Sequence, residues 1–371
     1  MKSLYITSSA DFAGKNLLLV GLGEQLKKDG YQISFFKPLG NKPIREDRII
    51  TDEDIVFFHR NLGLPLKSQL TLHHSLRSGT GLNCPVLVTE SLVEKTLSRK
   101  QGETLKKDLH RRVQQSYNSL AKANETVLIK GLGRFYRGGI FGLTEISLIK
   151  EFNWPTIIID KFASLAETVD GFIGAKEVLG NLLIGVVFNS VPPAKVNAIK
   201  SSAIPYLKNE GIDVLGIIPE ERALDAVSIR EIRDTLKGEL ITGKDQLEER
   251  VERFCMGITN VETALPVFRK EKCKAVITSG DRSDIQLAAL ETPLKGLILT
   301  DRLYPSDIIL SRAEELKVPV LVVPDDALRT MQKLEALSKH IGLSTPSKVK
   351  AAVRVIADRV NINKIYKIIK G

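Results

Sequence analysis

The sequence predicts an α/β protein in which a doubly wound parallel sheet is followed by a second, smaller α/β domain. Short runs of Val, Ile and Leu recur over about the first 220 residues, as in parallel strands that are buried on both faces. Segments with apolar residues at helical spacing separate these runs, and this alternation is typical of βαβ units. It resumes after a polar, glycine-interrupted stretch at 236–244. The chain is therefore expected to divide into 1–236, 245–345 and a basic helical tail at 346–371.

Two long helices are expected among the strands of the first domain. The helix expected at Asn16–Asp29 contains Gly21 and Gly23, which permit close packing against a neighbouring element. A longer helix at Glu103–Ala123 carries apolar residues every three or four positions. The expected strands are Leu4–Thr7, Gln32–Phe36, Val86–Thr89, Thr126–Ile129, Thr156–Asp160, Leu183–Phe188 and Val214–Ile217.

In the second domain, an Asp-Arg pair follows each of the first two expected strands. Asp281 and Arg282 come after one strand, and Asp301 and Arg302 come after the next. Both pairs are therefore expected at the carboxyl edge of parallel strands, where ligands bind in open α/β sheets. A purely structural role at a helix start stays open. The expected strands are Ala275–Thr278, Gly296–Leu299 and Val320–Val323, and helices are expected at about 284–291 and 306–316.

Composition excludes several classes of protein. Hydrophobic residues make up 43% of the chain and charged residues 26%, which is close to the average for globular domains. The three cysteines, Cys84, Cys255 and Cys273, form no C-x-x-C pair, which argues against a disulfide framework or a zinc site and favours a reducing, cytoplasmic location. The amino end lacks the pattern of a secretory signal, and no run of 18 uncharged apolar residues predicts a membrane span.

The net charge of +10 is concentrated near the carboxyl end of the chain. Between Ser344 and Gly371 there are seven Lys or Arg residues and one Asp, which gives this segment a net charge of +6. Such a segment can bind nucleic acid or anionic lipid. It contains one aromatic residue, Tyr366, and no nucleic-acid-binding motif. A solvated helix face is therefore the favoured interpretation.

The first expected strand leads into a loop that partly matches a phosphate-binding loop. Residues Ser8–Asn16 read S-S-A-D-F-A-G-K-N, whereas the standard pattern is G-x-x-x-x-G-K-[ST]. Gly14 and Lys15 match, Ser9 replaces the first glycine, and Asn16 replaces the hydroxyl residue. Backbone N–H groups and a helix N-terminus can still face an anion. The loop predicts a P-loop NTPase-like domain that binds ATP or another nucleotide, while the lost hydroxyl argues against Mg²⁺.

Several motifs occur in an order that is characteristic of one family. They are Ser9–Asn16, Phe36–Gly40, Thr51–Asp54, Gly185–Asn189, Leu215–Glu220, Gly280–Gln286 and Gly296–Thr300. With these motifs the chain resembles the dethiobiotin-synthetase-like domain at the amino end of long phosphotransacetylases, followed by the domain named for its Asp-Arg-Thr-Gly-Gly signature. The resemblance covers about residues 1–350. It implies a homo-oligomer and a chain without the acetyl-transfer domain of those enzymes.

This resemblance implies roles for individual residues of the first domain. Lys37 resembles the second active-site lysine of dethiobiotin synthetases, placed after the second strand. Asp52 or Asp54 is similar in position to an acidic metal ligand. Asn189 resembles the asparagine that recognises the nucleotide base, and Pro219 lies where the loop beside that base usually runs.

Two departures from the family pattern concern the metal ion. After the strand Thr126–Ile129 the family places a metal-binding glutamate before a glycine, whereas this chain has Lys130 and Gly131. Asn16 and Lys130 thus stand at two of the three expected Mg²⁺ positions. A lysine ammonium can hold a phosphate oxygen, but it cannot bridge the groups of an in-line transfer as a metal does. Metal-free binding of a nucleotide or another anion is the expected property of this site.

Three functions remain open at this stage. The favoured one is a regulatory, ligand-sensing protein whose phosphate loop binds without turnover, with a second small-molecule site at Asp281 and Arg282. The alternative is an ATP-dependent carboxylate-activating ligase of the dethiobiotin synthetase type, which Lys15 and Lys37 support. Binding to nucleic acid or a membrane surface through the basic tail is the least supported. A glycine-rich segment at 130–142 is expected either to cover the ligand with its arginines or to be a solvated connection.

Overall fold

The structure, a computed structural model, divides the chain into two compact units. The first unit consists of Met1–Glu221 and Leu343–Gly371, and the second of Arg222–Gly342. The chain therefore enters the second unit before the boundary expected at 236, and the expected tail belongs to the first unit. The earlier boundary arises because α10 (Ile229–Leu236) buries its apolar side chains in the core of the second unit. The described residues are 2–46, 49–64, 81–98, 102–124, 126–221, 226–271, 274–340 and 346–370.

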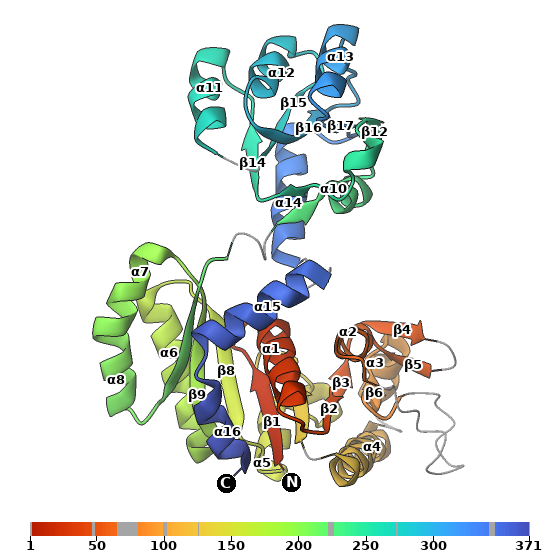
Figure 1. Cartoon of the computed structure of the whole chain (residues 1–371). Helices are drawn as coiled ribbons and strands as arrows, with labels where there is room; N and C mark the ends of the chain where they lie inside the picture. The colour runs from red at the N-terminus through yellow and green to blue at the C-terminus, as the bar shows by residue number, and fades with distance from the viewer. Residues whose placement is uncertain are drawn as a thin grey trace. The chain divides into compact units, whose positions relative to one another are not determined.

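A six-stranded sheet forms the centre of the first unit, in the order β10-β9-β8-β1-β7-β2 (Figure 1). All of its neighbouring strands run parallel, which confirms the predicted doubly wound sheet. Its strands are β1 (Lys2–Thr7), β2 (Ile33–Phe36), β7 (Thr126–Lys130), β8 (Thr156–Lys161), β9 (Leu183–Val191) and β10 (Val214–Pro219). One expected strand lies elsewhere, because β6 (Val86–Leu87) pairs with β3 (Leu39–Gly40) outside this sheet. A further hairpin, β4 (Pro43–Glu46) and β5 (Ile49–Asp52), was not expected from the sequence.

Helices cover both faces of this sheet because its strands alternate buried side chains between the two faces. One core combines Tyr5, Phe36 and Ile158 with apolar side chains of α4, α5 and α6. The opposite face is covered by α1, α15 and α16, which contact β1 or β10. The helices of the first unit are α1 (Lys15–Lys28), α2 (Glu53–Leu62), α3 (Glu90–Leu97), α4 (Gly102–Ala123), α5 (Glu145–Glu151), α6 (Leu165–Leu179), α7 (Pro193–Ala198), α8 (Ile204–Asn209), α15 (Pro346–Arg359) and α16 (Ile362–Lys370).

Of the two carboxyl-terminal helices, α15 packs onto the first helix of the chain, and α16 packs against β1 and β10. In Figure 1 α15, in blue, lies beside α1, in red. A Cβ atom added at Gly21 of α1 would lie 2.4 Å from the Cβ of Ile356 in α15, so this glycine permits the close packing that the sequence predicted. The expected tail helix is interrupted between α15 and α16, where the Asn361 N–H donates to the Leu215 carbonyl of β10. The tail is therefore an integral part of the first unit.

The second unit is built on a five-stranded sheet in the order β12-β17-β16-β15-β14. Four of these strands run parallel, and β12 joins the edge in the antiparallel direction. The strands are β12 (Glu239–Thr242), β14 (Arg253–Met256), β15 (Lys274–Ser279), β16 (Leu294–Thr300) and β17 (Val320–Val322), and β11 (Val227–Ser228) pairs separately with β13 (Arg250–Val251). The remaining helices are α11 (Val261–Lys270), α12 (Ser283–Leu290), α13 (Asp307–Glu315) and α14 (Ala327–His340). The predicted second α/β domain is thus confirmed as a fold.

Among the described residues, no helix combines the length and the apolar character that a lipid bilayer would require. Cys84 and Cys255 are buried and have free thiols. Cys273 lies outside the described residues.

Candidate functional site

The loop between β1 and α1 is held in place by residues from neighbouring strand ends. The Ser9 N–H donates to the Asp160 carboxylate of β8 at 2.8 Å. The Asn189 side chain of β9 donates to the Ala13 carbonyl at 2.9 Å. Gly14 adopts a φ of 108° and would place a Cβ atom 2.3 Å from the Asn189 Nδ2, so both backbone conformation and space require glycine here. Asn189 therefore supports the loop directly.

The Lys15 side chain folds back under the glycine-rich segment. Its Nζ lies 2.5 Å from the Ser8 hydroxyl, and a Cβ atom on Gly133 would approach it to 2.7 Å. Burial lowers the pKa of Lys15, while the nearby carboxylates of Glu145 and Asp11 oppose this effect. The ammonium group is thus enclosed at the loop, where it can hold an anion without reaching into solvent.

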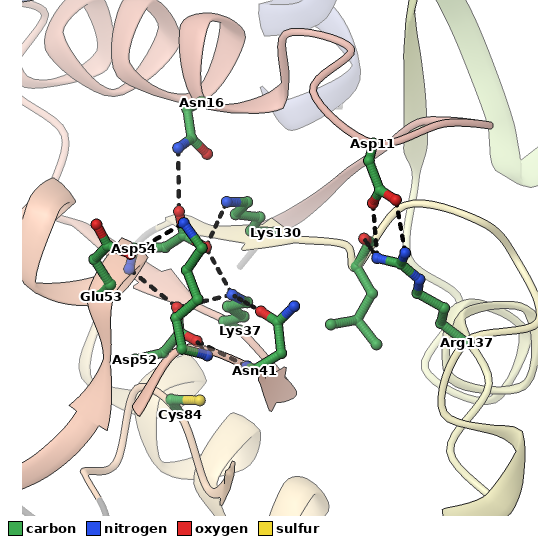
Figure 2. A network of polar contacts seen from close by, with 12 residues as sticks. Asp11, Asn16, Lys37, Asn41, Asp52, Glu53, Asp54, Cys84, Lys130 and Arg137 are labelled. Carbon is green, nitrogen blue, oxygen red and sulfur yellow. Dashed lines mark hydrogen bonds and ion pairs between the residues drawn. The ribbon is translucent and has the colours of Figure 1, made fainter. Parts of the chain in front are cut away.

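A lysine–aspartate cluster, defined here as Lys37, Asp52, Asp54 and Lys130, lies beside this loop (Figure 2). The Lys37 Nζ lies 2.7 Å from Asp52 and 2.6 Å from Asp54. The Lys130 Nζ, at the end of β7, lies 2.5 Å from the same Oδ2 of Asp54. The Asn16 amide of α1 donates to the other Asp54 oxygen at 3.1 Å. The structure thus brings together residues that the sequence had assigned to metal or cofactor binding.

Burial and charge pairing set the pKa values in this cluster. Burial lowers the pKa of Lys130 to about 8, since the attraction of Asp54 only partly offsets burial and the repulsion of Lys37. Burial alone would raise the pKa of Asp54, but the two ammonium groups outweigh it and hold the pKa far below its usual range. For Lys37, burial by itself would lower the pKa, but the attraction of Asp54 and Asp52 outweighs burial and raises the pKa above its ordinary value. Asp54 and Lys37 are therefore charged at neutral pH.

Asp52 has a structural task of its own. It is fully buried and N-caps α2, where it accepts the Asp54 N–H at 3.0 Å. Its second oxygen accepts the N–H groups of Asn41 at 2.9 Å and Lys42 at 3.0 Å. Both oxygens of Asp52 are therefore engaged by backbone N–H groups and by Lys37.

The glycine-rich segment is joined to the phosphate loop by an ion pair. Arg137 donates two parallel hydrogen bonds of 2.7 Å to the Asp11 carboxylate, as Figure 2 shows. The Arg134 Nε lies 3.7 Å from the same carboxylate, and its backbone N–H donates to the Ser8 carbonyl at 2.9 Å. Both arginines therefore face the loop. A role of this segment in covering a ligand stays a prediction.

Glu145 is a residue of this site that the sequence analysis missed. It is the first residue of α5, is 1% exposed, and accepts a hydrogen bond from the Thr7 hydroxyl at the end of β1. Burial raises its pKa to about 7, against the opposing effects of Thr7 and Lys15. A Cβ atom on Gly131 would lie 2.9 Å from a Glu145 oxygen, which explains that glycine. An acidic residue in a first helical turn is so common that no signal in the sequence singled it out.

The other predicted site residues lie apart from this network. Pro219 ends β10 at the same sheet edge as Asn189, beside the strand end of β9. In the second unit the Arg282 guanidinium pairs with Asp284 at 2.9 Å and donates to the Thr259 carbonyl at 3.0 Å. Asp281 is exposed beside it. The role of Asp281 and Arg282 as a ligand site stays a prediction.

Two protein families match this chain. Residues 2–228, which include the loop and the lysine–aspartate cluster, match the model of a family described as an AAA domain. The chain belongs to this AAA-domain family. Residues 231–337 match the DRTGG domain. The two matches occur in the order that the sequence predicted.

Similar proteins support the same relationship. A phosphate acetyltransferase of Synechocystis sp. is 21% identical, over 99% of this chain and 52% of that protein. The chain thus spans about half the length of the phosphate acetyltransferases it matches. An ATP-dependent dethiobiotin synthetase of Bacillus thuringiensis is 22% identical, over 59% of this chain and 84% of that protein. The predicted resemblance to both groups is therefore confirmed.

Among solved structures, the CBS and DRTGG domains of the regulatory region of Clostridium perfringens pyrophosphatase, complexed with the activator diadenosine tetraphosphate, cover 41% of this chain and 71% of their own. The identity is 17% and the TM-score is 0.28.

Proposed function

We propose that the first unit binds the phosphate groups of a nucleotide at the loop between β1 and α1, and that this binding serves regulation without turnover. The observation that carries the proposal is the convergence of three ammonium groups. Lys15 from α1, Lys37 after β2 and Lys130 at the end of β7 all lie at the carboxyl edge of the parallel sheet. A helix N-terminus and fixed positive charges together attract phosphate.

The regulatory part of the proposal follows from the chemistry around Lys130. Phosphoryl transfer relies on metal ions that bridge the phosphate and neutralise developing charge. Here an ammonium group occupies the end of β7 and is paired with Asp54. The AAA and DRTGG regions together match about half the length of phosphate acetyltransferases, and a sensing role for this half is consistent with that arrangement.

A thermal unfolding experiment tests the binding. We expect ADP or ATP at a hundred times its dissociation constant to add about 2.7 kcal/mol to the free energy of unfolding of the wild type. Lys15→Ala should abolish this stabilisation, whereas Lys122→Ala, which removes an exposed lysine on α4, should not. A wild type that neither nucleotide stabilises would refute the proposal.

The alternative is an ATP-dependent carboxylate-activating ligase of the dethiobiotin synthetase type. The observation in its favour is that Lys15 and Lys37, the two lysines that the resemblance assigns to the reaction, both lie at the loop edge. Release of ADP and phosphate from ATP in the presence of Mg²⁺ and a carboxylic acid or an amine with bicarbonate would establish it. The absence of ADP release under conditions where ATP binds would leave the regulatory function.

A further inference from the structure

The Asp54 carboxylate is the centre of a site that is already neutralised by the protein itself. Its Oδ2 accepts from Lys37 at 2.6 Å and from Lys130 at 2.5 Å, and its Oδ1 accepts from Asn16 at 3.1 Å. These partners come from α1, the end of β2 and the end of β7, so three separate elements are arranged around one carboxylate. The Asp54 side chain is 14% exposed and the Lys130 side chain 12% exposed, so the ion pair is largely screened from water.

A magnesium ion does not fit these side chains. Mg²⁺ requires oxygen ligands in octahedral geometry at about 2.0–2.1 Å. Both oxygens of Asp54 and both oxygens of Asp52 are engaged by ammonium or amide groups. Within the described ranges, no group of three or more His, Cys, Asp or Glu side chains could hold a metal ion. The Asn16 Oδ1 is buried without a hydrogen-bond partner, but one neutral oxygen does not make a metal site.

An anion can still bind at this edge of the sheet. Lys37 and Lys130 balance the charges of Asp52 and Asp54. The loop N–H groups, the start of α1 and the Lys15 ammonium beside Ser8 favour an approaching phosphate. A phosphate oxygen can share the ammonium groups that Asp54 now holds. A phosphate already complexed with Mg²⁺ offers fewer free oxygens and less negative charge to these lysines.

We propose that the Lys130 ammonium is a built-in replacement for a divalent cation, so that the first unit selects the metal-free diphosphate group of a nucleotide. This inference rests on the proposed function and specifies the form in which the nucleotide binds. Lys130 holds the diphosphate from the end of β7, Lys15 holds it from the loop, and Asp54 keeps Lys130 oriented until the ligand arrives. The lowered pKa of Lys130 accords with an ammonium that is enclosed between a carboxylate and a second lysine.

Calorimetric titration of ADP into the full chain, with EDTA or with saturating Mg²⁺, tests the inference. We expect the wild type to bind ADP in EDTA at least as tightly as with Mg²⁺. Lys130→Met should weaken binding in EDTA roughly 10- to 100-fold, the usual effect of losing one charge-assisted hydrogen bond. Lys130→Arg should retain metal-free binding because it keeps the positive charge, and the control Lys122→Met should bind as the wild type does. Fluorescence of Trp154, buried in the first unit, verifies that each variant is folded.

The outcomes separate the inference from the function on which it rests. Wild-type binding that requires Mg²⁺ would overturn the inference and leave nucleotide binding intact. Equal affinity of Lys130→Met and the wild type for ADP in EDTA would also overturn the inference and leave nucleotide binding intact. No binding of ADP to the wild type in either buffer would overturn both. If Lys130→Met does not fold, Lys130→Arg decides: metal-free binding by that variant supports the built-in cation, and a new requirement for Mg²⁺ contradicts it.

Discussion

Replacing Glu145 by glutamine is expected to change how the stability of the first unit depends on pH. Glu145 is 1% exposed, and burial raises its pKa from the ordinary 4.5 to about 7. The folded protein therefore holds this proton more tightly than the unfolded chain does. The stability that the bound proton contributes is fully present below pH 4.5 and is lost as the pH rises through 7. The glutamine side chain is neutral at every pH, so the Glu145→Gln variant should not show this loss.

The size of the effect follows from the two pKa values. The full difference between 4.5 and about 7 corresponds to roughly 3 kcal/mol, at 1.36 kcal/mol per pKa unit. Between pH 5 and pH 8 the linkage relation gives about 2.5 kcal/mol of this. We therefore expect the free energy of unfolding of Glu145→Gln, relative to the wild type, to rise by that amount over this range. Other titrating groups are present in both proteins and largely cancel in the difference.

Trp154 provides a specific probe for the assay. It is the single tryptophan of the chain, is 1% exposed, and stacks on Tyr5 with ring centroids 5.4 Å apart. Its fluorescence during urea unfolding at each pH therefore reports on the first unit. Glu177→Gln, which changes an exposed glutamate of α6, is the matched control and should follow the wild type at both pH values. Parallel pH profiles for Glu145→Gln and the wild type would refute the reasoning.

Four further substitutions are expected to change stability, each measured by urea unfolding with Trp154 as the probe. Gly14→Ala should cost about 1–3 kcal/mol, because φ is 108° and the new Cβ would meet Asn189; an unchanged midpoint would contradict this. Gly21→Ala should destabilise by roughly 1–3 kcal/mol through its clash with α15, whereas Gly171→Ala, with no atom within 4 Å, should gain about 0.5–1 kcal/mol; equal effects would refute the packing argument. Lys37→Met should cost about 3 kcal/mol because it removes the buried ammonium that Asp52 and Asp54 share and leaves Asp52 with backbone N–H partners alone, and a neutral result would show that these ion pairs contribute little.

Local patterns were sufficient to predict the two sheets and the position of the loop. Runs of Val, Ile and Leu identify β1, β7, β8, β9 and β10. Both faces of a central parallel strand are buried, so nearly all of its residues are apolar. The loop could be located because a strand followed by Gly14 and Lys15 at the start of a helix is a contiguous pattern. Short or edge elements have no continuous apolar run. The β4–β5 hairpin was therefore missed, and β6 was assigned to the wrong sheet.

The sequence by itself therefore determined the fold class, the order of the two domains and the lysines that could meet a phosphate. Only the tertiary structure decided that Asn16, Lys37 and Lys130 all converge on Asp54, that Glu145 lies buried beneath the loop, and that the tail completes the first unit by packing on α1. The physical reason is the range of the interactions. Hydrophobic periodicity and turn chemistry are local along the chain, whereas ion pairs and desolvation depend on which distant segments the sheet order brings within a few ångströms of one another.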